Sequence, residues 1–153
     1  MEKTLVILKP SCVQRALMGD VISRFEKKGL RLSGMKMVQL SDAILSEHYA
    51  HLKEKPFFQR VKDSMQICPV VVQCWEGIDA ARVVRSIIGV TNGRDAAAGT
   101  IRGDFSMSSQ ENIVHASDSA ASAEIELKRF FADEEIFDYK LSMLANLYAS
   151  DEI

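Results

Sequence analysis

The sequence predicts an α/β fold, an α+β sandwich in which helices pack against an antiparallel sheet. Short apolar runs that end near proline or glycine alternate with longer segments of helical periodicity. Their order is strand, helix, strand, two helices, strand, helix, long loop, strand and helix. Without the added helices this is β-α-β-β-α-β, the ferredoxin-like order. A length of 153 residues suits one domain spanning residues 1–153.

The first part of the predicted motif is a strand, a helix and a second strand. Residues 4–8 (TLVIL) form a continuous apolar run that a Lys-Pro pair ends, which is typical of a buried strand. Apolar side chains then repeat at helical spacing from Leu17 to Phe25, and Gly29 is suited to the left-handed cap of this helix. Residues 30–40 alternate loosely and predict a second strand, with Gly34 as a bulge.

A pair of helices interrupts the motif before the third strand. Ser41 is suited to cap a polar helix that continues through residues 42–52, and a second short helix is expected over residues 57–65. The β-branched and aromatic residues 70–75 predict the third strand. The next helix is expected over residues 80–88, because its apolar residues recur at helical spacing.

A long loop precedes the last strand and the last helix. Residues 89–110 show no clear periodicity, and a loop of this length inside a compact domain is usually functional. Residues 111–115 predict a short strand. Ser117 or Asp118 is expected to cap a final helix over residues 120–130, in which small and apolar residues are aligned on one face.

Composition and charge exclude several classes of protein. The chain is 47% hydrophobic and 26% charged, which excludes fibrous and disordered classes. Its net charge of −2 argues against a dedicated nucleic-acid surface or a membrane-surface binder. No apolar run is long enough to span a bilayer. The three cysteines include no C-x-x-C pair, so we expect a reducing, cytoplasmic location rather than a disulfide framework.

Arginines gather in and beside the long loop. No lysine occurs between Lys62 and Lys128, so arginines carry all the positive charge of that stretch. A guanidinium grips phosphate oxygens through two parallel contacts, and a loop that folds back would bring Arg85 and Arg102 to one anion. Solvated surface charge is the alternative for each arginine taken alone. No P-loop or G-x-G-x-x-G motif is present, so a phosphate site here is of another kind.

The histidines fall into two groups with different interpretations. His48 and His51 lie three residues apart on a polar helix, and without a third ligand we expect a solvated pair rather than a metal site. His115 ends the predicted buried strand, and Glu124 and Glu126 follow in the first turns of the last helix, where either is placed to orient the imidazole. A histidine held by a carboxylate is suited to nucleophilic or general-base catalysis, whereas a hydrogen-bonded core histidine is the alternative.

Several segments of the chain resemble one enzyme family. Residues 112–119 (NIVHASDS) resemble the active-site signature N-x-x-H-[GA]-S-D-S of the nucleoside diphosphate kinases. Further segments resemble the same family in the same order: residues 4–15 (TLVILKPSCVQR), His48-Tyr49, Lys55–Phe58 and residues 99–105 (GTIRGDF). The resemblance covers about residues 3–140. It implies transfer of the γ-phosphoryl group from a nucleoside triphosphate, such as ATP, to a nucleoside diphosphate by a ping-pong mechanism, with broad base and sugar specificity.

The resemblance also implies a role for each matching residue. His115 would accept the phosphoryl group through Nδ1, while Glu126, with Ser117 behind it, would orient the imidazole. The nucleotide contacts would be Lys9, Tyr49, Arg85, Thr91 and Arg102 to phosphate, Lys9 and Asn112 to the sugar, and Phe57 and Val61 to the base. Mg²⁺ would arrive on the nucleotide phosphates rather than in a protein cage, because this hard ion keeps its waters. A homo-oligomer is expected, with a hexamer favoured over a tetramer.

The chain departs from the family pattern at a few positions. Ser11-Cys12 replaces the usual Asp-Gly, and Ala116 stands where glycine is commoner. Gly93 and Ala98 replace prolines of the long loop, which raises the entropy cost of ordering that loop. None of these changes removes a catalytic side chain.

Two other functions are compatible with the residues taken alone. One is a regulatory module that binds a nucleotide as an effector, and the other is a histidine phosphocarrier that receives its phosphate from a protein. A nucleophilic His115 beside a phosphate site argues against the first. The aromatic base platform at Phe57 argues against the second.

Overall fold

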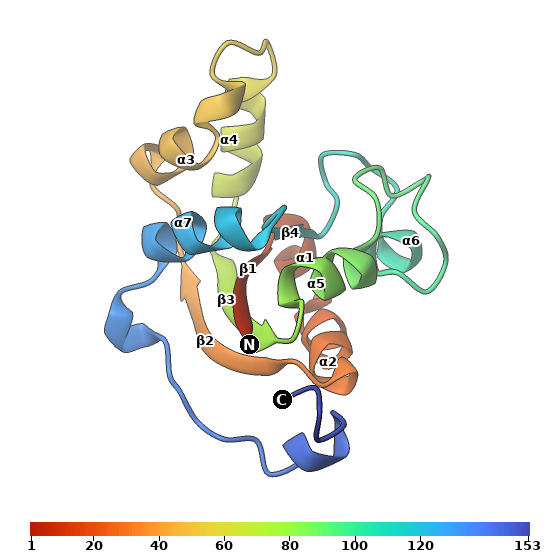
Figure 1. Cartoon of the computed structure of the whole chain (residues 1–153). Helices are drawn as coiled ribbons and strands as arrows, with labels where there is room; N and C mark the ends of the chain where they lie inside the picture. The colour runs from red at the N-terminus through yellow and green to blue at the C-terminus, as the bar shows by residue number, and fades with distance from the viewer.

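A computed structural model, which describes residues 1–153, contains one four-stranded antiparallel sheet in the order β2-β3-β1-β4 (Figure 1). The strands are β1 (Glu2–Leu8), β2 (Arg31–Val38), β3 (Val70–Gly77) and β4 (Val114–Ala116). β1 pairs with β3 along its whole length and with β4 through Val6 to Leu8. The predicted α+β, ferredoxin-like arrangement is confirmed, and it places the short strand β4 at an edge of the sheet.

The helices cover both faces of this sheet. They are α1 (Pro10–Gln14), α2 (Met18–Lys28), α3 (Asp42–His48), α4 (Phe58–Gln66), α5 (Ala80–Ile88), α6 (Ile101–Phe105) and α7 (Ala120–Phe130), with short 3-10 turns η1 (Ala50–Leu52), η2 (Asp133–Glu135) and η3 (Leu144–Asn146). Ser41 caps α3 as predicted, because its Oγ accepts the amide hydrogen of Ile44 at 3.2 Å. Gly29 ends α2 at a φ of 99°, which favours glycine.

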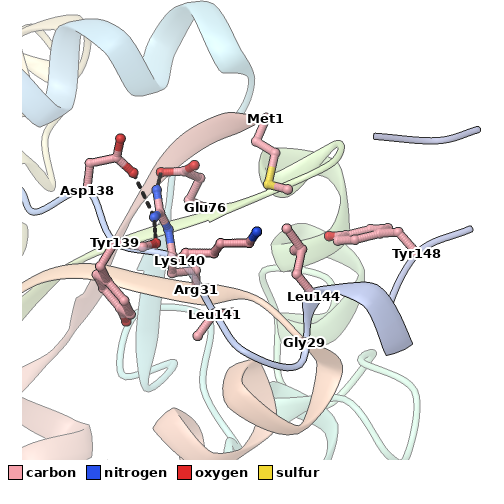
Figure 2. Close-up of a pocket in the computed structure, with 10 residues that line it drawn as sticks. All are labelled: Met1, Gly29, Arg31, Glu76, Asp138, Tyr139, Lys140, Leu141, Leu144 and Tyr148. Carbon is pink, nitrogen blue, oxygen red and sulfur yellow. Dashed lines mark hydrogen bonds and ion pairs between the residues drawn. The ribbon is translucent and has the colours of Figure 1, made fainter. Parts of the chain in front are cut away.

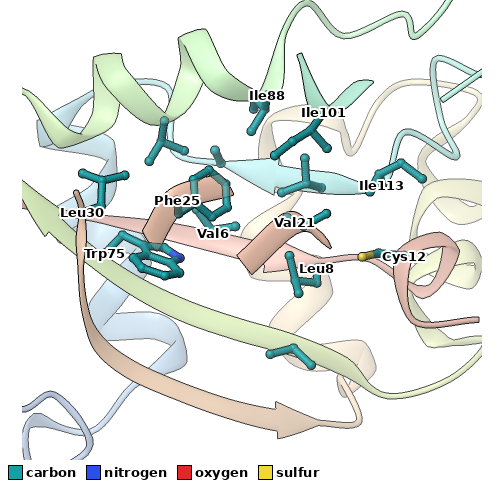
Figure 3. Packing of buried hydrophobic residues seen from close by; sticks show 14 of the residues in the cluster. Val6, Leu8, Cys12, Val21, Phe25, Leu30, Trp75, Ile88, Ile101 and Ile113 are labelled. Atoms are coloured by element: carbon teal, nitrogen blue, oxygen red, sulfur yellow. The ribbon is translucent and has the colours of Figure 1, made fainter. Parts of the chain in front are cut away.

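β1 is almost entirely buried and divides the hydrophobic interior into two layers. On one face, α2 and α5 pack against side chains such as Val6 and Trp75. Figure 3 shows this layer, in which the ring centroids of Phe25 and Trp75 lie 5.3 Å apart. On the other face, α3 and α7 pack against Leu5 and Ile7. Because β1 is packed into both hydrophobic layers, its C-terminal end is fixed in position, and so is the start of the segment that follows it.

The structure corrects four details of the sequence prediction. Pro10 opens the short helix α1, which the sequence analysis did not predict, and α6 lies inside the stretch expected to be an irregular loop. β4 begins at Val114 rather than at residue 111. The cap of α7 is Ser119, because Ser117 and Asp118 are engaged elsewhere, with a carboxylate and with an arginine. The expected bulge in β2 is confirmed by a register shift at Leu32/Gly34.

The C-terminal residues 132–153 run along β2 and return towards α2 (Figure 1). Arg31 of β2 pairs with Asp138 at 2.7 Å and with Glu76 of β3 at 2.6 Å. Figure 2 shows these ion pairs beside a cavity of about 580 Å³ between the tail and the sheet. Arg31 bridges the carboxylates of Glu76 in the sheet and Asp138 in the tail, so its guanidinium links the tail to the sheet.

None of the helices has the length and apolar composition that a segment crossing a bilayer requires.

Candidate active site

A second cavity, of about 510 Å³, opens where the α3–α4 hairpin, the long loop, β4 and α7 meet. Nearly all the residues that the resemblance implied come together in its wall, although they are spread along the chain. The lining includes Lys9, Tyr49, Phe57, Val61, Arg85, Thr91, Arg102, Asn112, His115 and Glu126. Ser117 is the one expected residue that does not line the cavity, and it contacts Glu126 from behind.

His115 sits in β4, opposite Ile7 of β1, with its side chain 24% exposed. Its Nε2 is buried and lies 3.4 Å from Oε1 of Glu126, an ion-pair distance rather than a hydrogen bond. The Ser117 hydroxyl donates a short hydrogen bond to Oε2 of the same carboxylate. The ring is therefore anchored on its Nε2 side, and no hydrogen bond within the chain engages Nδ1.

Glu126 remains ionised across the physiological range. Burial acts to raise the pKa of Glu126, but contact with His115 and the hydrogen bond from Ser117 lower it to about 2. A permanent negative charge beside Nε2 favours a proton there and leaves the lone pair on Nδ1. Of the two carboxylates that the sequence offered, only Glu126 does this, because Glu124 is exposed on the outer side of α7.

His48 was predicted to be one of a solvated pair, and this is wrong. His51 is exposed on η1, but His48 is buried and its ring packs edge-on against His115 at 4.7 Å between centroids. Arg129 donates to Nδ1 of His48 at 3.0 Å, and burial, together with His115, lowers the pKa of His48 to about 3. His48 is therefore neutral and packs against the ring of His115.

The cluster of His48, His115 and Glu126 also has ligand-type atoms within 4.8 Å of one another. A metal ion on Nδ1 of His48 would have to displace the guanidinium of Arg129, which already occupies that lone pair. The positive charge of Arg129 opposes a second cation at this position. The arrangement fits a packed histidine pair better than a metal centre.

Lys9 follows β1 and crosses to the segment before β4. Its Nζ donates to Oδ1 of Asn112 at 2.9 Å and to the carbonyl of Gln110 at 2.7 Å. Asn112 in turn donates to the carbonyl of Thr91 at 2.9 Å, so three distant segments meet here. Burial, with a contribution from Arg102, lowers the pKa of Lys9 to about 8. The ammonium group is still mostly charged at neutral pH.

Arg102 is 4% exposed and uses its guanidinium to organise the backbone. It donates to the carbonyls of Gly89, Asn112 and Val114 at 3.1, 3.3 and 2.7 Å. Burial and the neighbouring charge of Arg85 lower the pKa of Arg102 to about 10, which keeps it cationic at neutral pH. Two of its five N–H groups remain without a carbonyl partner and are free for an anion.

Arg85 approaches the same region from the last turn of α5. Its Nη1 lies 3.1 Å from Oδ1 of Asp118, whose side chain is 82% exposed. Both arginines line the cavity, so the loop does bring Arg85 and Arg102 to one place as the sequence suggested. An exposed ion pair of this kind contributes little to stability, which leaves Arg85 free to exchange Asp118 for a phosphate.

The chain just before β4 is conformationally strained. Ile113 has a φ of +73°, which a β-branched residue rarely adopts. Its amide donates to Oγ of Ser11 at 3.2 Å, and its carbonyl accepts from the amide of Lys9 at 2.9 Å. Ser11, one of the departures from the family pattern, therefore holds the turn that delivers His115 two residues later.

One end of the cavity lies between α4 and the loop segment before β4. Phe57 is 37% exposed at the rim, and Val61 lies one turn further along α4. The structure adds Arg60 and Gln110 to this wall, two polar residues that the sequence analysis did not assign. The only signal for Arg60 was its helical spacing of three residues from Phe57.

Comparison with known proteins agrees with this geometry. The family model described as nucleoside diphosphate kinase matches residues 2–136. The chain is 74% identical over 152 residues to the nucleoside diphosphate kinase of Parabacteroides distasonis, covering 99% of each protein. It is 50% identical over 141 residues to the nucleoside diphosphate kinase of Pyrococcus abyssi, covering 90% of this chain and 89% of that relative.

Solved structures agree in fold. A halophilic nucleoside diphosphate kinase from Halobacterium salinarum, in complex with CDP, matches with a TM-score of 0.94 and 40% identity over 96% of this chain and 98% of that chain. A nucleoside diphosphate kinase family protein from Babesia bovis matches with a TM-score of 0.93 and 39% identity over 97% of this chain and 100% of that chain. The chain belongs to the nucleoside diphosphate kinase family.

Proposed function

We propose that this nucleoside diphosphate kinase transfers the phosphoryl group in two steps, through a phosphohistidine on Nδ1 of His115. The observation that carries the proposal is the anchoring of the ring, with Nε2 held 3.4 Å from Glu126 and Nδ1 left without a partner in the chain. A neutral imidazole with its proton on Nε2 has its nucleophilic lone pair on Nδ1.

In the first step, Nδ1 attacks the γ-phosphorus of the donor. The bond to the bridging oxygen breaks, its electron pair leaves with the nucleoside diphosphate, and the proton stays on Nε2. The positive charge that develops on the imidazole is stabilised by the ionised Glu126. In the second step, a terminal phosphate oxygen of the acceptor attacks the same phosphorus, and the P–N electron pair returns to Nδ1.

Three cations of the cavity are suited to the phosphate chain. Lys9, Arg85 and Arg102 line one region, and positioning with charge neutralisation is what phosphoryl transfer chiefly requires. Mg²⁺ enters as part of the Mg–nucleotide substrate. This fits the acidic residues of the cavity, because Glu126 is engaged by Ser117 and His115 while Asp118 pairs with Arg85.

Phe57 and Val61 supply an apolar platform for the base, and stacking tolerates every base. Broad acceptance of purine and pyrimidine nucleotides follows from such a platform. The Halobacterium salinarum relative was solved in complex with CDP, which supports nucleotide binding by this chain.

Initial-rate kinetics test the two-step mechanism. With GTP as donor and dTDP as acceptor, each varied at several fixed concentrations of the other, a substituted-enzyme mechanism gives parallel double-reciprocal lines. We expect parallel lines. Lines that intersect to the left of the axis would mean that donor and acceptor bind together, and the phosphohistidine route would be wrong.

The proposal extends to the organisation of the protein. Residues 1–153 would act as one domain, and the chain would assemble as a homo-oligomer, a hexamer rather than a tetramer, in the cytoplasm. Exposed apolar side chains on the edge strand β2 support assembly, since Met35 is 51% and Met37 58% exposed.

A further inference from the structure

One hydrogen bond crosses the base end of the active-site cavity. Arg60 of α4 donates through Nε to Oε1 of Gln110 at 2.9 Å. No other hydrogen bond or ion pair joins the α3–α4 hairpin, residues 42–66, to the long loop and the segment before β4, residues 89–113. The two walls that would enclose a base are therefore linked at this single point.

Gln110 is a fixed partner for Arg60. Its carbonyl accepts from Lys9 at 2.7 Å, and its amide donates to Oγ of Ser108 at 3.1 Å. Its side-chain amide also donates to Oε1 of Glu111 at 3.2 Å, which sets Oε1 of Gln110 as the acceptor that faces Arg60. The backbone that positions the phosphate-binding Lys9 thus also orients the Arg60 guanidinium.

Arg60 is placed to meet the edge of a stacked base. It lies one helical turn beyond Phe57 and next to Val61, and all three side chains line the cavity. The bond to Gln110 uses Nε only, so Nη1 and Nη2 of Arg60 have no partner in the chain. These groups are hydrogen-bond donors and never acceptors.

We propose that Arg60, oriented by Gln110, is a specificity-determining residue that favours bases carrying a carbonyl on their exposed edge. Guanine and hypoxanthine present O6 and N7 as acceptors, and uracil and thymine present O4. Adenine shares N7 but presents an amino donor in place of O6, and cytosine presents an amino donor in place of O4, so each offers the donors of Arg60 one acceptor fewer at this edge. The inference rests on the proposed function, because it takes Phe57 as the base platform.

The expected preference is modest. A solvent-exposed hydrogen bond adds little net free energy, so we expect GDP to exceed ADP, and UDP to exceed CDP, by roughly three- to tenfold in kcat/KM. The preference should appear mainly in KM, because the base edge is remote from the phosphorus. Broad acceptance of nucleotides is retained at this magnitude.

The test measures kcat/KM for ADP, GDP, IDP, CDP and UDP with one fixed Mg-nucleotide donor. IDP has the O6 and N7 of GDP but lacks its 2-amino group, so we expect IDP to group with GDP. In Arg60→Ala the GDP/ADP and UDP/CDP ratios should both fall towards the value set by stacking alone. Gln110→Ala, which releases Arg60, should reduce both ratios in part.

Gln59→Ala is the matched control, because Gln59 precedes Arg60 on α4 and its amide bonds to Asp63 at 2.7 Å, within the same helix. This variant should keep the wild-type ratios. If Arg60→Ala lowers kcat/KM equally for all five acceptors, Arg60 only closes the cavity and the proposal is overturned. If kcat/KM for IDP is close to that for ADP, the enzyme recognises the 2-amino group of guanine rather than O6, and the proposal is overturned. Failure of the wild-type enzyme to use any acceptor would instead contradict the proposed function.

Discussion

At the scale of single residues, Arg102 and Lys9 are both held by hydrogen bonds within the chain and both line the cavity. Arg102 binds three backbone carbonyls and also faces the cavity, and Lys9 bonds two acceptors before any substrate is present. In the proposed mechanism, the charge that would meet a phosphate is thus held in place by the same bonds that shape the loop. Preorganised charge of this kind stabilises a transition state without reorganisation during the reaction.

Replacing Arg102 by lysine should therefore reduce both activity and stability. A lysine cannot bond three carbonyls and a phosphate with one ammonium group. We expect Arg102→Lys to lower kcat on the order of 10²-fold and the free energy of unfolding by about 1–3 kcal/mol. Urea denaturation and steady-state kinetics measure the two effects. Arg82→Lys, an exposed residue of α5 paired with Asp79, is the control and should change neither.

The pH dependence of kcat/KM should report Lys9. Its pKa is lowered to about 8 in the free enzyme by burial, so the ammonium charge is present below that pH and is lost as pH rises through it. Because kcat/KM follows the free enzyme, it should fall above about pH 8. In Lys9→Arg, which stays charged, this fall should disappear even if the overall rate is lower. A profile that stays flat to pH 9.5 in the wild type would exclude Lys9 as the phosphate ligand.

At the scale of elements, the contact between α1 and the residues just before β4 decides where His115 lies. Ser11 is in α1, and its hydroxyl accepts a hydrogen bond from the amide of the strained Ile113, about a hundred residues later in the sequence. The alternative for that buried amide is to remain unbonded, which is costly.

Removing the Ser11 hydroxyl should make the position of the His115 side chain less fixed. We expect Ser11→Ala to lower the free energy of unfolding by about 1–3 kcal/mol and to reduce kcat, because His115 follows the freed turn. Ser11→Thr keeps the hydroxyl and should retain most of both properties. Thermal or urea unfolding and the transfer rate are the measurements. Wild-type stability in Ser11→Ala would show that Ile113 is held by packing alone.

The sequence predicted elements whose signals are local. The Ser41 cap and the bulge at Gly34 depend on spacing within a few residues. Spacing left both Glu124 and Glu126 open as partners of His115, and only the family resemblance implied Glu126. Helix α6 was missed because five residues are too few for a periodic pattern. The burial of His48 was missed because helical spacing does not say which element will cover a histidine.

At the scale of the whole molecule, the β1 strand and its two buried faces hold the site together. Lys9 follows β1, His115 pairs beside it in β4, and α7 carries Glu126 over the second layer. The α3–α4 hairpin and the long loop add the remaining walls of the cavity. Contacts such as Arg60–Gln110 depend on this assembly and cannot be inferred from either segment alone.

The exposed edge of the sheet belongs to the same scale. An edge strand with exposed methionines and a tail that leaves them uncovered are typical of a surface that pairs with another copy. We expect light scattering to give a mass six times that of the 17.1 kDa chain. A tetramer would contradict the hexamer, and a stable monomer would contradict assembly altogether.

The most direct test of the central claim is to locate the phosphate on the enzyme. The protein is mixed with Mg-ATP labelled at the γ position, without an acceptor, and separated from nucleotide. We expect one acid-labile, alkali-stable phosphate per chain, mapped to His115, which is lost on adding GDP with formation of labelled GTP. His115→Ala should bind nucleotide and take up no label. Label on Ser117 or Ser119, or a phosphate that GDP does not remove, would contradict the account.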